Sequence, residues 1–457
     1  MILSKKMKFY GLRDLENIPQ MNNLSEEARF ATKVVSHVLP FRTNNYIIEE
    51  LIDWDNVPND PIFQLTFMQR DMLLPEQFNK MADAILRDEN SEKLKAIANE
   101  IRYELNPHPA GQMTANVPIE NDEVIPGVQH KYRETALVFP SAGQTCHAYC
   151  TFCFRWAQFV GINDLKFATD ESNRFQSYLK NHKEITDVLF TGGDPMVMGI
   201  KKLEAYILPL LKPEFEHIKS IRIGTKSISY WPFKYVTDKD ADAVLGLLDK
   251  IVAAGKHLAF MAHFNHHIES STPIAHEAIR RIRETGAQIR TQSPIIKHIN
   301  DDAAVWAKMW KDQVALGMIP YYMFIERQTG AQNYFEVPLS RTLEIYRDAI
   351  QEVSGLCRTV RGPSMSATPG KVSIEGISKV YGQKVFVLNF LQSRNPDWIK
   401  RPFFAKYDES AGWLTDLEPA FGEEKFFYQG ELKQMLEKKR NRIEKIEEDK
   451  EDVLQSA

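Results

Sequence analysis

The sequence predicts a mixed α/β fold built around a partial (β/α)6 barrel. Between residues 126 and 335, short apolar runs alternate with amphipathic helical segments, which is the pattern of a parallel sheet. The first 125 residues instead show helical periodicity interrupted by proline-containing loops. The six expected strands are TALVF, DVLFTG, SIRIGT, LAFMAHF, AQIRTQS and YYMFIE.

The helical segments between these strands are IKKLEAYILPLL, DADAVLGLLDKIVAAG, TPIAHEAIRRIRETG and AAVWAKMWKDQVALG, and the last three end on glycine, as many helices do. After them, SRTLEIYRDAI predicts a helix, SGLCRTVRG a strand, PSMSATPGK a loop, and KVSIEG with KVFVLNF a hairpin. We therefore divide the chain into an N-terminal helical region (1–125), the partial barrel (126–335), a C-terminal extension (336–415) and a charged helical tail (416–457).

The composition of the 457 residues is that of a globular protein, with 43% hydrophobic and 26% charged residues. The net charge of −4 provides no basic surface for nucleic acid or an anionic membrane, so small molecules are the expected partners. The N-terminus lacks the apolar segment of a signal peptide, and no apolar run is long enough to cross a bilayer. We expect a cytoplasmic protein whose charged tail is either a solvated helix or an oligomer contact.

Three of the four cysteines, Cys146, Cys150 and Cys153, lie in one short segment with the spacing CxxxCxxC. Three thiolates on one loop can ligate three irons of a [4Fe–4S] cluster and leave the fourth iron open for another ligand. The alternative is a structural zinc loop, but zinc sites of that kind have four protein ligands, and no second cysteine pair follows. Only Cys357 remains outside the motif, so no disulfide framework is expected.

The segment TGGDP follows the second expected strand. Gly192 and Gly193 would let the backbone approach a ligand closely, and the carboxylate of Asp194 could accept hydrogen bonds from an ammonium group. On its own, such a segment is more often a tight turn. Because it comes one strand after the cysteines, both segments should lie at the carboxyl edge of the sheet, where reactive groups gather.

Together the two motifs resemble those of radical S-adenosylmethionine (radical SAM) enzymes, in which the GGD-type segment holds the amino group of SAM. The chain is similar in particular to the lysine 2,3-aminomutase family through RIGTK, HFNH, TQSPII with a following ND, PYY and PGK, in the family's order between residues 130 and 390. Enzymes of that family carry a [4Fe–4S] cluster, SAM and pyridoxal phosphate (PLP), and they move an amino group from Cα to Cβ. The resemblance implies a radical SAM barrel, this isomerase chemistry, and an electron donor such as flavodoxin or ferredoxin. The resemblance leaves open whether the chain forms a homo-oligomer.

The resemblance also implies roles for single residues. Lys371 matches the lysine that holds PLP covalently, although the family's glycine-rich run before it is here PSMSATPG. Arg155 matches the arginine that pairs with the α-carboxylate of the substrate, for which a guanidinium fork is suited. His263 and Gln292 match positions that line the SAM site, and Tyr132 matches a tyrosine beside the PLP ring. Without the resemblance, Lys371 would be assigned to a surface turn and Arg155 to an ion pair. His263 and Gln292 would be structural hydrogen-bonding groups, and Tyr132 a core side chain.

Two positions depart from the lysine-specific enzymes, which place aspartates around the distal ammonium of their substrate. The first falls here on Arg327, and the second, seven residues before Lys371, on Ser364. A buried ammonium without an anionic partner is costly, so lysine is disfavoured as the substrate unless Glu326 turns inward. Arg327 instead favours an acidic substrate such as glutamate. The family's zinc-binding cysteines have no counterpart after Cys357, so we expect no zinc.

Two rival hypotheses stay open. The chain could use the cluster and SAM without PLP in another radical reaction, as the altered loop before Lys371 suggests. Alternatively, it could be a non-catalytic iron–sulfur or zinc-binding scaffold, although a scaffold has no need for an amine-binding GGD turn.

Overall fold

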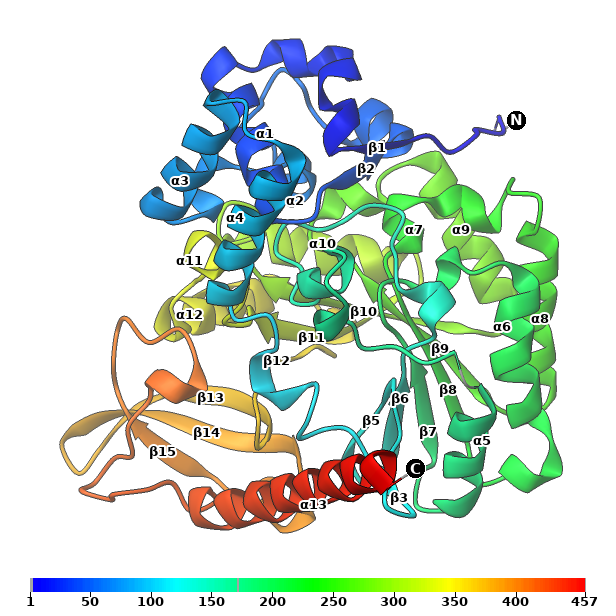
Figure 1. Ribbon diagram of the computed structural model, residues 1–457, viewed down its shortest axis with the longest axis vertical. Helices are drawn as coiled ribbons and strands as arrows, with labels where there is room; N and C mark the ends of the chain where they lie inside the picture. The colour runs from blue at the N-terminus through cyan, green and yellow to red at the C-terminus, as the bar shows by residue number, and fades with distance from the viewer. Residues whose placement is uncertain (1–2, 171, 457) are drawn as a thin grey trace.

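The computed structural model describes residues 3–170 and 172–456, with the side chains of 450–456 left out. The fold is mixed α/β with a mostly parallel sheet (Figure 1). Within the described residues, the main sheet has 11 strands in the order β15-β14-β13-β12-β11-β10-β9-β8-β7-β6-β5. Strands β6 to β12 run parallel to one another, while the strands at either end are antiparallel to their neighbours.

The six strands expected from the sequence form the centre of this sheet: β6 (Thr135–Val138), β7 (Asp187–Phe190), β8 (Ser220–Thr225), β9 (His257–His263), β10 (Gln288–Ile295) and β11 (Ile319–Ile325). Each pairs in parallel with the next in chain order, so their carboxyl ends meet at one edge. The loops after β6 and β7 carry the cysteines and the GGD segment to that edge.

The connecting helices are α5 (Ser172–Asn181), α6 (Ile200–Ile207), α8 (Ala241–Ala253), α9 (Pro273–Glu284), α10 (Ala303–Ala315) and α12 (Leu339–Gln351). Their apolar faces join the strands in one hydrophobic core. The expected glycine ends of three helices are confirmed: Gly255, Gly286 and Gly317 follow α8, α9 and α10 with φ of 77°, 83° and 74°, in the left-handed region.

The N-terminal region packs over the carboxyl edge of the sheet (Figure 1). It contains β1 (Phe9–Gly11), β2 (Arg42–Asn44), α1 (Glu26–Val38), α2 (Pro61–Thr66), α3 (Pro75–Leu86) and α4 (Ser91–Glu104). Its apolar core includes Ala148 and Trp156 of the cysteine loop. The buried amide of Asn44 donates to the carbonyls of His147 and Tyr230, both at 3.0 Å. The cysteine loop is therefore anchored by the N-terminal region as well as by the sheet.

The C-terminal extension continues the sheet through β12 (Arg361–Ser366), β13 (Gly370–Val380), β14 (Gln383–Ser393) and β15 (Phe403–Lys406). The expected hairpin is confirmed as β13 and β14. The strand expected at 354–362 and the loop expected at 363–371 are wrong, because the strand begins at Arg361 and Lys371 already lies in β13. This serine- and proline-containing segment forms a strand because β11 and β13 pair with it on both sides.

A long loop and the C-terminal helix lie side by side. Residues 107–118 lead through β3 (Ile119–Glu120) and β4 (Glu123–Val124) into β5 (Val128–Tyr132). Helix α13 (Gln429–Ser456) crosses this region (Figure 1): the Nζ of Lys439 donates to the carbonyl of Ala115 at 2.9 Å, and Arg442 pairs with Asp122 at 3.1 Å. One side of the charged tail is thus a contact within the chain. The exact boundaries of the four-part division stay a prediction.

None of the helices in the described ranges is long and apolar enough to cross a membrane.

Candidate active site

The three cysteines of the CxxxCxxC loop line one cavity of about 280 Å³, which we call the cysteine cavity. All three thiols are free. Burial raises the pKa of Cys150 to about 11 and that of Cys153 to about 12. Since thiols with such pKa values keep their protons at neutral pH, the loop becomes anionic only when a metal displaces those protons.

The three thiols line one open space that a metal cluster could occupy. Throughout the described part of the chain, no three His, Cys, Asp or Glu side chains are grouped to hold one metal ion. In a cubane cluster each thiolate binds a different iron, so the three ligands surround a larger body. Three thiols from one loop, with open space beside them, therefore fit a [4Fe–4S] cluster that keeps one iron free.

The diglycine turn after β7 lies directly against the start of the cysteine loop. A Cβ added to Gly193 would lie 2.4 Å from the carbonyl oxygen and 2.5 Å from the nitrogen of Thr145. The next N–H, that of Asp194, donates to the carbonyls of Thr145 at 2.7 Å and Gly143 at 3.0 Å. The close approach of two backbones explains why glycine occupies position 193.

Asp194 is only 2% exposed, and groups of the protein donate hydrogen bonds to its carboxylate. It accepts from the hydroxyl of Thr225 at 2.7 and 2.8 Å and from the N–H groups of Lys226 and Met196, both at 2.9 Å. Burial raises its pKa to about 6, against the opposing effect of these donors. The carboxylate thus ties the turn to the end of β8, and Asp194 also lines the cysteine cavity. Its expected contact with an ammonium group stays a prediction.

His263 and Gln292 lie at paired positions of β9 and β10 and line the cysteine cavity. The amide of Gln292 donates to Nε2 of His263 at 2.7 Å. Burial lowers the pKa of His263 to about 3, so its imidazole is neutral. Both side chains are thus fixed polar groups at strand ends.

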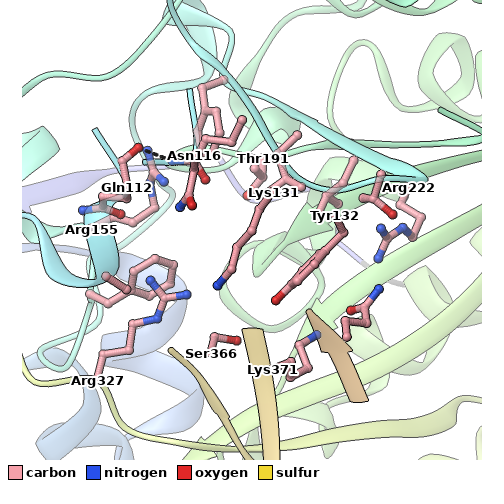
Figure 2. A pocket seen from close by; sticks show the side chains of 18 residues that line it. Gln112, Asn116, Lys131, Tyr132, Arg155, Thr191, Arg222, Arg327, Ser366 and Lys371 are labelled. Carbon is pink, nitrogen blue, oxygen red and sulfur yellow. Dashed lines mark hydrogen bonds between the residues drawn. The ribbon is translucent and has the colours of Figure 1, made fainter. Parts of the chain in front are cut away.

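A second cavity, of about 170 Å³, adjoins the first, and we call it the cationic cavity. Its basic lining residues are Lys131, Arg155, Arg222, Arg327 and Lys371, and no aspartate or glutamate is among the described residues that line it. Figure 2 shows these side chains approaching one space from several elements, with Tyr132 among them. All of the cations except Lys131 line the cysteine cavity too, so the two cavities share a wall.

Lys371 lies on this shared wall at the start of β13. Its Nζ is 3.9 Å from the ring centroid of Tyr322 and 5.3 Å from that of Phe324. Burial, together with the smaller effect of three nearby guanidinium groups, lowers the pKa of this amine to about 7. An amine with this pKa has a substantial neutral fraction near pH 7, and the neutral form is a nucleophile for an aldehyde such as that of PLP. The donor set on this wall, an amine beside unpaired cations, fits a phosphate-bearing aldehyde.

Arg155 and Arg327 form no ion pair within the described residues, although the neighbouring Glu326 opposes the lowering of the Arg327 pKa by burial. Arg155 is 6% exposed, and its Nε and Nη2 atoms are buried without a hydrogen-bond partner there. Both guanidiniums lie over aromatic rings, Arg155 4.1 Å from the centroid of Phe139 and Arg327 4.2 Å from that of Phe154. Because an unpaired buried charge is costly, this arrangement indicates an anionic ligand.

The serine that lies beside Lys371 is Ser366 and not Ser364, which the sequence comparison had named. Ser364 lines neither cavity, and its hydroxyl is buried without a partner among the described residues. Ser366, on the same face of β12, lines both cavities because it pairs directly with Lys371. Glu326 lines the cysteine cavity but not the cationic cavity, and burial raises its pKa well above the usual range.

Sequence reasoning missed several lining residues, namely Lys131, Thr191, Arg222, Lys226 and Ser366. Most of them lie within or next to a quoted motif, since Lys131 precedes Tyr132 and Arg222 with Lys226 belongs to RIGTK. A position at the carboxyl end of a parallel strand is the signal that could have found Thr191 and Lys226.

No family model matches the chain. A protein from Aquifex aeolicus (strain VF5) named "Putative L-lysine 2,3-aminomutase" is 32% identical over 416 residues, covering 91% of this chain and 96% of that protein. An "L-lysine 2,3-aminomutase" from Bacillus subtilis (strain 168) is 24% identical over 423 residues, covering 91% of this chain and 76% of that protein. Among solved structures, a radical SAM methyltransferase from Sphaerobacter thermophilus matches with a TM-score of 0.35 and 13% identity, covering 51% of this chain and 68% of that one.

A mostly parallel sheet that presents a CxxxCxxC loop beside a diglycine turn at its carboxyl edge defines a radical SAM protein. The Aquifex relative, matched over nearly its whole length, narrows this class further. The chain belongs to the lysine 2,3-aminomutase family. The resemblance that the sequence motifs indicated is confirmed.

Replacing Gly193 with alanine should displace the cysteine loop, because the new Cβ would meet backbone atoms of Thr145. Overpacking of this kind costs about 1–3 kcal/mol, and we expect a severalfold loss of iron per chain after anaerobic reconstitution. Gly199→Ala is the matched control, since its Cβ would meet nothing within 4 Å. Equal iron contents in the two variants would contradict the tight contact.

The rate of covalent PLP attachment to Lys371 should rise with pH through about pH 7, because only the neutral amine attacks and burial lowers its pKa to about 7. Below that pH the amine is protonated, so the rate should fall roughly tenfold per pH unit. Stopped-flow absorbance measures the rate, and Lys371→Ala should show no attachment. A rate that continues to rise towards about pH 10, the ordinary lysine value, would contradict the lowered pKa.

Proposed function

We propose that this protein is a radical SAM, PLP-dependent amino acid 2,3-aminomutase that moves an amino group from Cα to Cβ of an acidic substrate such as glutamate. One observation carries the proposal: Lys371 and Arg155 line both the cysteine cavity and the cationic cavity. A substrate held by these two side chains would lie beside the three thiols. The sequential parallel order of β6 to β11 supports the partial barrel expected of such an enzyme.

The residues divide into three groups around this shared wall. The cysteine loop would hold a [4Fe–4S] cluster, residues 192–194 with His263 and Gln292 would hold SAM, and Lys371 would hold PLP. When bound, the cluster and SAM supply a carbon-centred radical that removes hydrogen from Cβ, and PLP supplies the π bond across which nitrogen moves. The contribution of the chain is to orient the substrate and to exclude water.

Arg155 is suited to orient the substrate through its α-carboxylate. Its unpartnered Nε and Nη2 atoms can donate two parallel hydrogen bonds, the fork geometry that a carboxylate accepts. The ring of Phe139, 4.1 Å from the guanidinium, packs against one face of it and restricts its movement. A carboxylate gripped in this way keeps Cβ at a fixed distance from the cysteine cavity.

The remaining charges favour an acidic side chain on the substrate. Arg222 is already paired with Asp187 at 2.8 Å, and Arg155 is assigned to the α-carboxylate. Arg327 and Lys131 are then left for two anions, the PLP phosphate and a side-chain carboxylate. The Nζ of Lys131 also donates to the carbonyl of Ala367, and burial lowers its pKa well below the usual lysine value, so a bound anion would favour its charged form. Glu326 does not substitute for the missing aspartates, because it lines the cysteine cavity alone and burial raises its pKa, which disfavours the charged form.

Anaerobic reconstitution with iron and sulfide tests the proposed function. The protein should cleave SAM when reduced and, with PLP, convert a member of an amino acid mixture into its β-amino isomer, scored by chromatography against standards. Replacing Cys146, Cys150 or Cys153 with alanine should abolish SAM cleavage, because a cluster that lacks a protein ligand no longer reserves one iron for SAM. Lys371→Ala should keep SAM cleavage and lose the β-amino product.

The rival hypotheses predict different results in the same assay. SAM cleavage without any borohydride-trapped PLP would support a PLP-independent radical reaction. A cluster that never cleaves SAM would support the non-catalytic scaffold. Normal SAM cleavage in all three cysteine variants would remove the radical SAM proposal altogether.

Glutamate should be preferred over lysine by at least tenfold in kcat/KM, because leaving a buried charge unpaired costs about 2–5 kcal/mol. Arg327→Asp should reverse part of this preference, and adding Ser366→Asp should strengthen the reversal, since Ser366 rather than Ser364 faces Lys371. Competition assays with equal amounts of both amino acids measure the ratio directly.

Arg347→Asp is the matched control, since Arg347 is an exposed arginine whose side chain is 67% accessible. It should leave the ratio unchanged. If Arg327→Gln weakens PLP binding without changing the glutamate-to-lysine ratio, Arg327 holds the phosphate and the acidic-substrate argument fails. Efficient turnover of lysine by the unmodified protein would contradict it as well.

The cytoplasmic location, the flavodoxin- or ferredoxin-type electron donor and the homo-oligomer stay predictions.

A further inference from the structure

One tyrosine hydroxyl lies against a cysteine of the CxxxCxxC loop. Tyr230 ends the short helix α7 (Ser227–Tyr230) that follows β8, and it is 1% exposed. Its hydroxyl oxygen is 3.3 Å from the Sγ of Cys150. Among the described residues, Cys146 and Cys153 have no side-chain hydrogen-bond partner. The hydrogen bonding of the three thiols is therefore unequal.

Tyr230 is held firmly in this position. Its backbone carbonyl accepts from the buried amide of Asn44, which also anchors the cysteine loop. The Nζ of Lys226 lies 4.5 Å from the centroid of the phenol ring and is itself fixed by an ion pair with Glu269. In the described residues the hydroxyl has no other hydrogen-bond partner, so it is directed at Cys150 alone.

A thiolate that ligates iron has no proton to give, so the Tyr230 hydroxyl must be the donor. Hydrogen bonds to the sulfurs are one of the factors that set the reduction potential of an iron–sulfur cluster. Such a bond is stronger when the acceptor carries more negative charge, so it stabilises the reduced state more than the oxidised state. The ammonium of Lys226 above the ring also favours the reduced state. It attracts electron density from the phenol and so makes the hydroxyl a stronger hydrogen-bond donor.

We propose that Tyr230 raises the reduction potential of the cluster by donating a hydrogen bond to the thiolate of Cys150. The inference rests on the proposed function, because it requires a cluster on the CxxxCxxC loop. The step is the uptake of one electron from an external one-electron donor protein; no bond breaks, and Tyr230 keeps its proton. Tyr230 is thus a positioning residue that makes the cluster easier to reduce before SAM is cleaved.

The test is the midpoint potential of the reconstituted protein, followed by electron paramagnetic resonance during a redox titration without SAM. Tyr230→Phe removes only the hydroxyl and should lower the equilibrium constant for reduction about tenfold, which is about 59 mV for one electron. Tyr46→Phe is the matched control: it removes another buried hydroxyl, bonded to Thr272 at 2.7 Å, from the same apolar core. The control should keep the potential of the unmodified protein.

A second variant guards against loss of the cluster in Tyr230→Phe. Placing 3-fluorotyrosine at position 230 keeps the side chain and makes its hydroxyl a stronger donor, so the potential should shift upward. The proposal is overturned if cluster-loaded Tyr230→Phe keeps the original potential, if Tyr46→Phe shifts it equally, or if the fluorinated protein shows no upward shift. A wild-type protein that takes up no cluster would instead reject the proposed function.

Discussion

The contact between the diglycine turn and the cysteine loop is the constraint on which the site depends. Gly193 meets the backbone of Thr145 so closely that no side chain fits between them. The adjacent Asp194 then binds the cysteine loop through its N–H and the end of β8 through its carboxylate. The loops after β6 and β7 and the end of β8 are therefore fixed relative to one another by bonds within the chain. Ligands enter a site whose geometry is already set.

The second cavity follows a different physical rule, because its charges are left unbalanced. Buried cations without anions lower the stability of the free protein. The same arrangement lowers the pKa of Lys371 to about 7, mainly through burial, and so keeps its amine reactive at neutral pH. Anions that bind near Arg155 and Arg327 would relieve the repulsion. A cavity with this charge balance would favour negatively charged ligands, as the proposed function requires.

The parts of the fold and site that were predictable from sequence are those that local spacing encodes. Apolar periodicity located β6 to β11, and the CxxxCxxC and GGD spacings located the groups after β6 and β7. Ser364 was chosen by counting along the chain, whereas the pairing of β12 with β13 brings Ser366 to Lys371. The GGD spacing placed Asp194 at the cysteine cavity, but it did not show that three donors of the protein bind its carboxylate. Spacing along one segment does not show which partner another segment supplies.

The contact of Tyr230 with Cys150 was also not predictable from the spacing of residues along one segment. Nothing in SISYWPF marks a tyrosine for contact with a cysteine 80 residues earlier. The contact exists because the loops after β6 and β8 flank the GGD turn, and because Asn44 of the N-terminal region binds the backbones of His147 and Tyr230 at once. That amide anchors the backbones that carry the thiol and the phenol, and it bonds to neither side chain. Control of the electron-accepting centre would therefore depend on a residue outside the sheet, which gives the N-terminal region a chemical role in addition to covering the carboxyl edge.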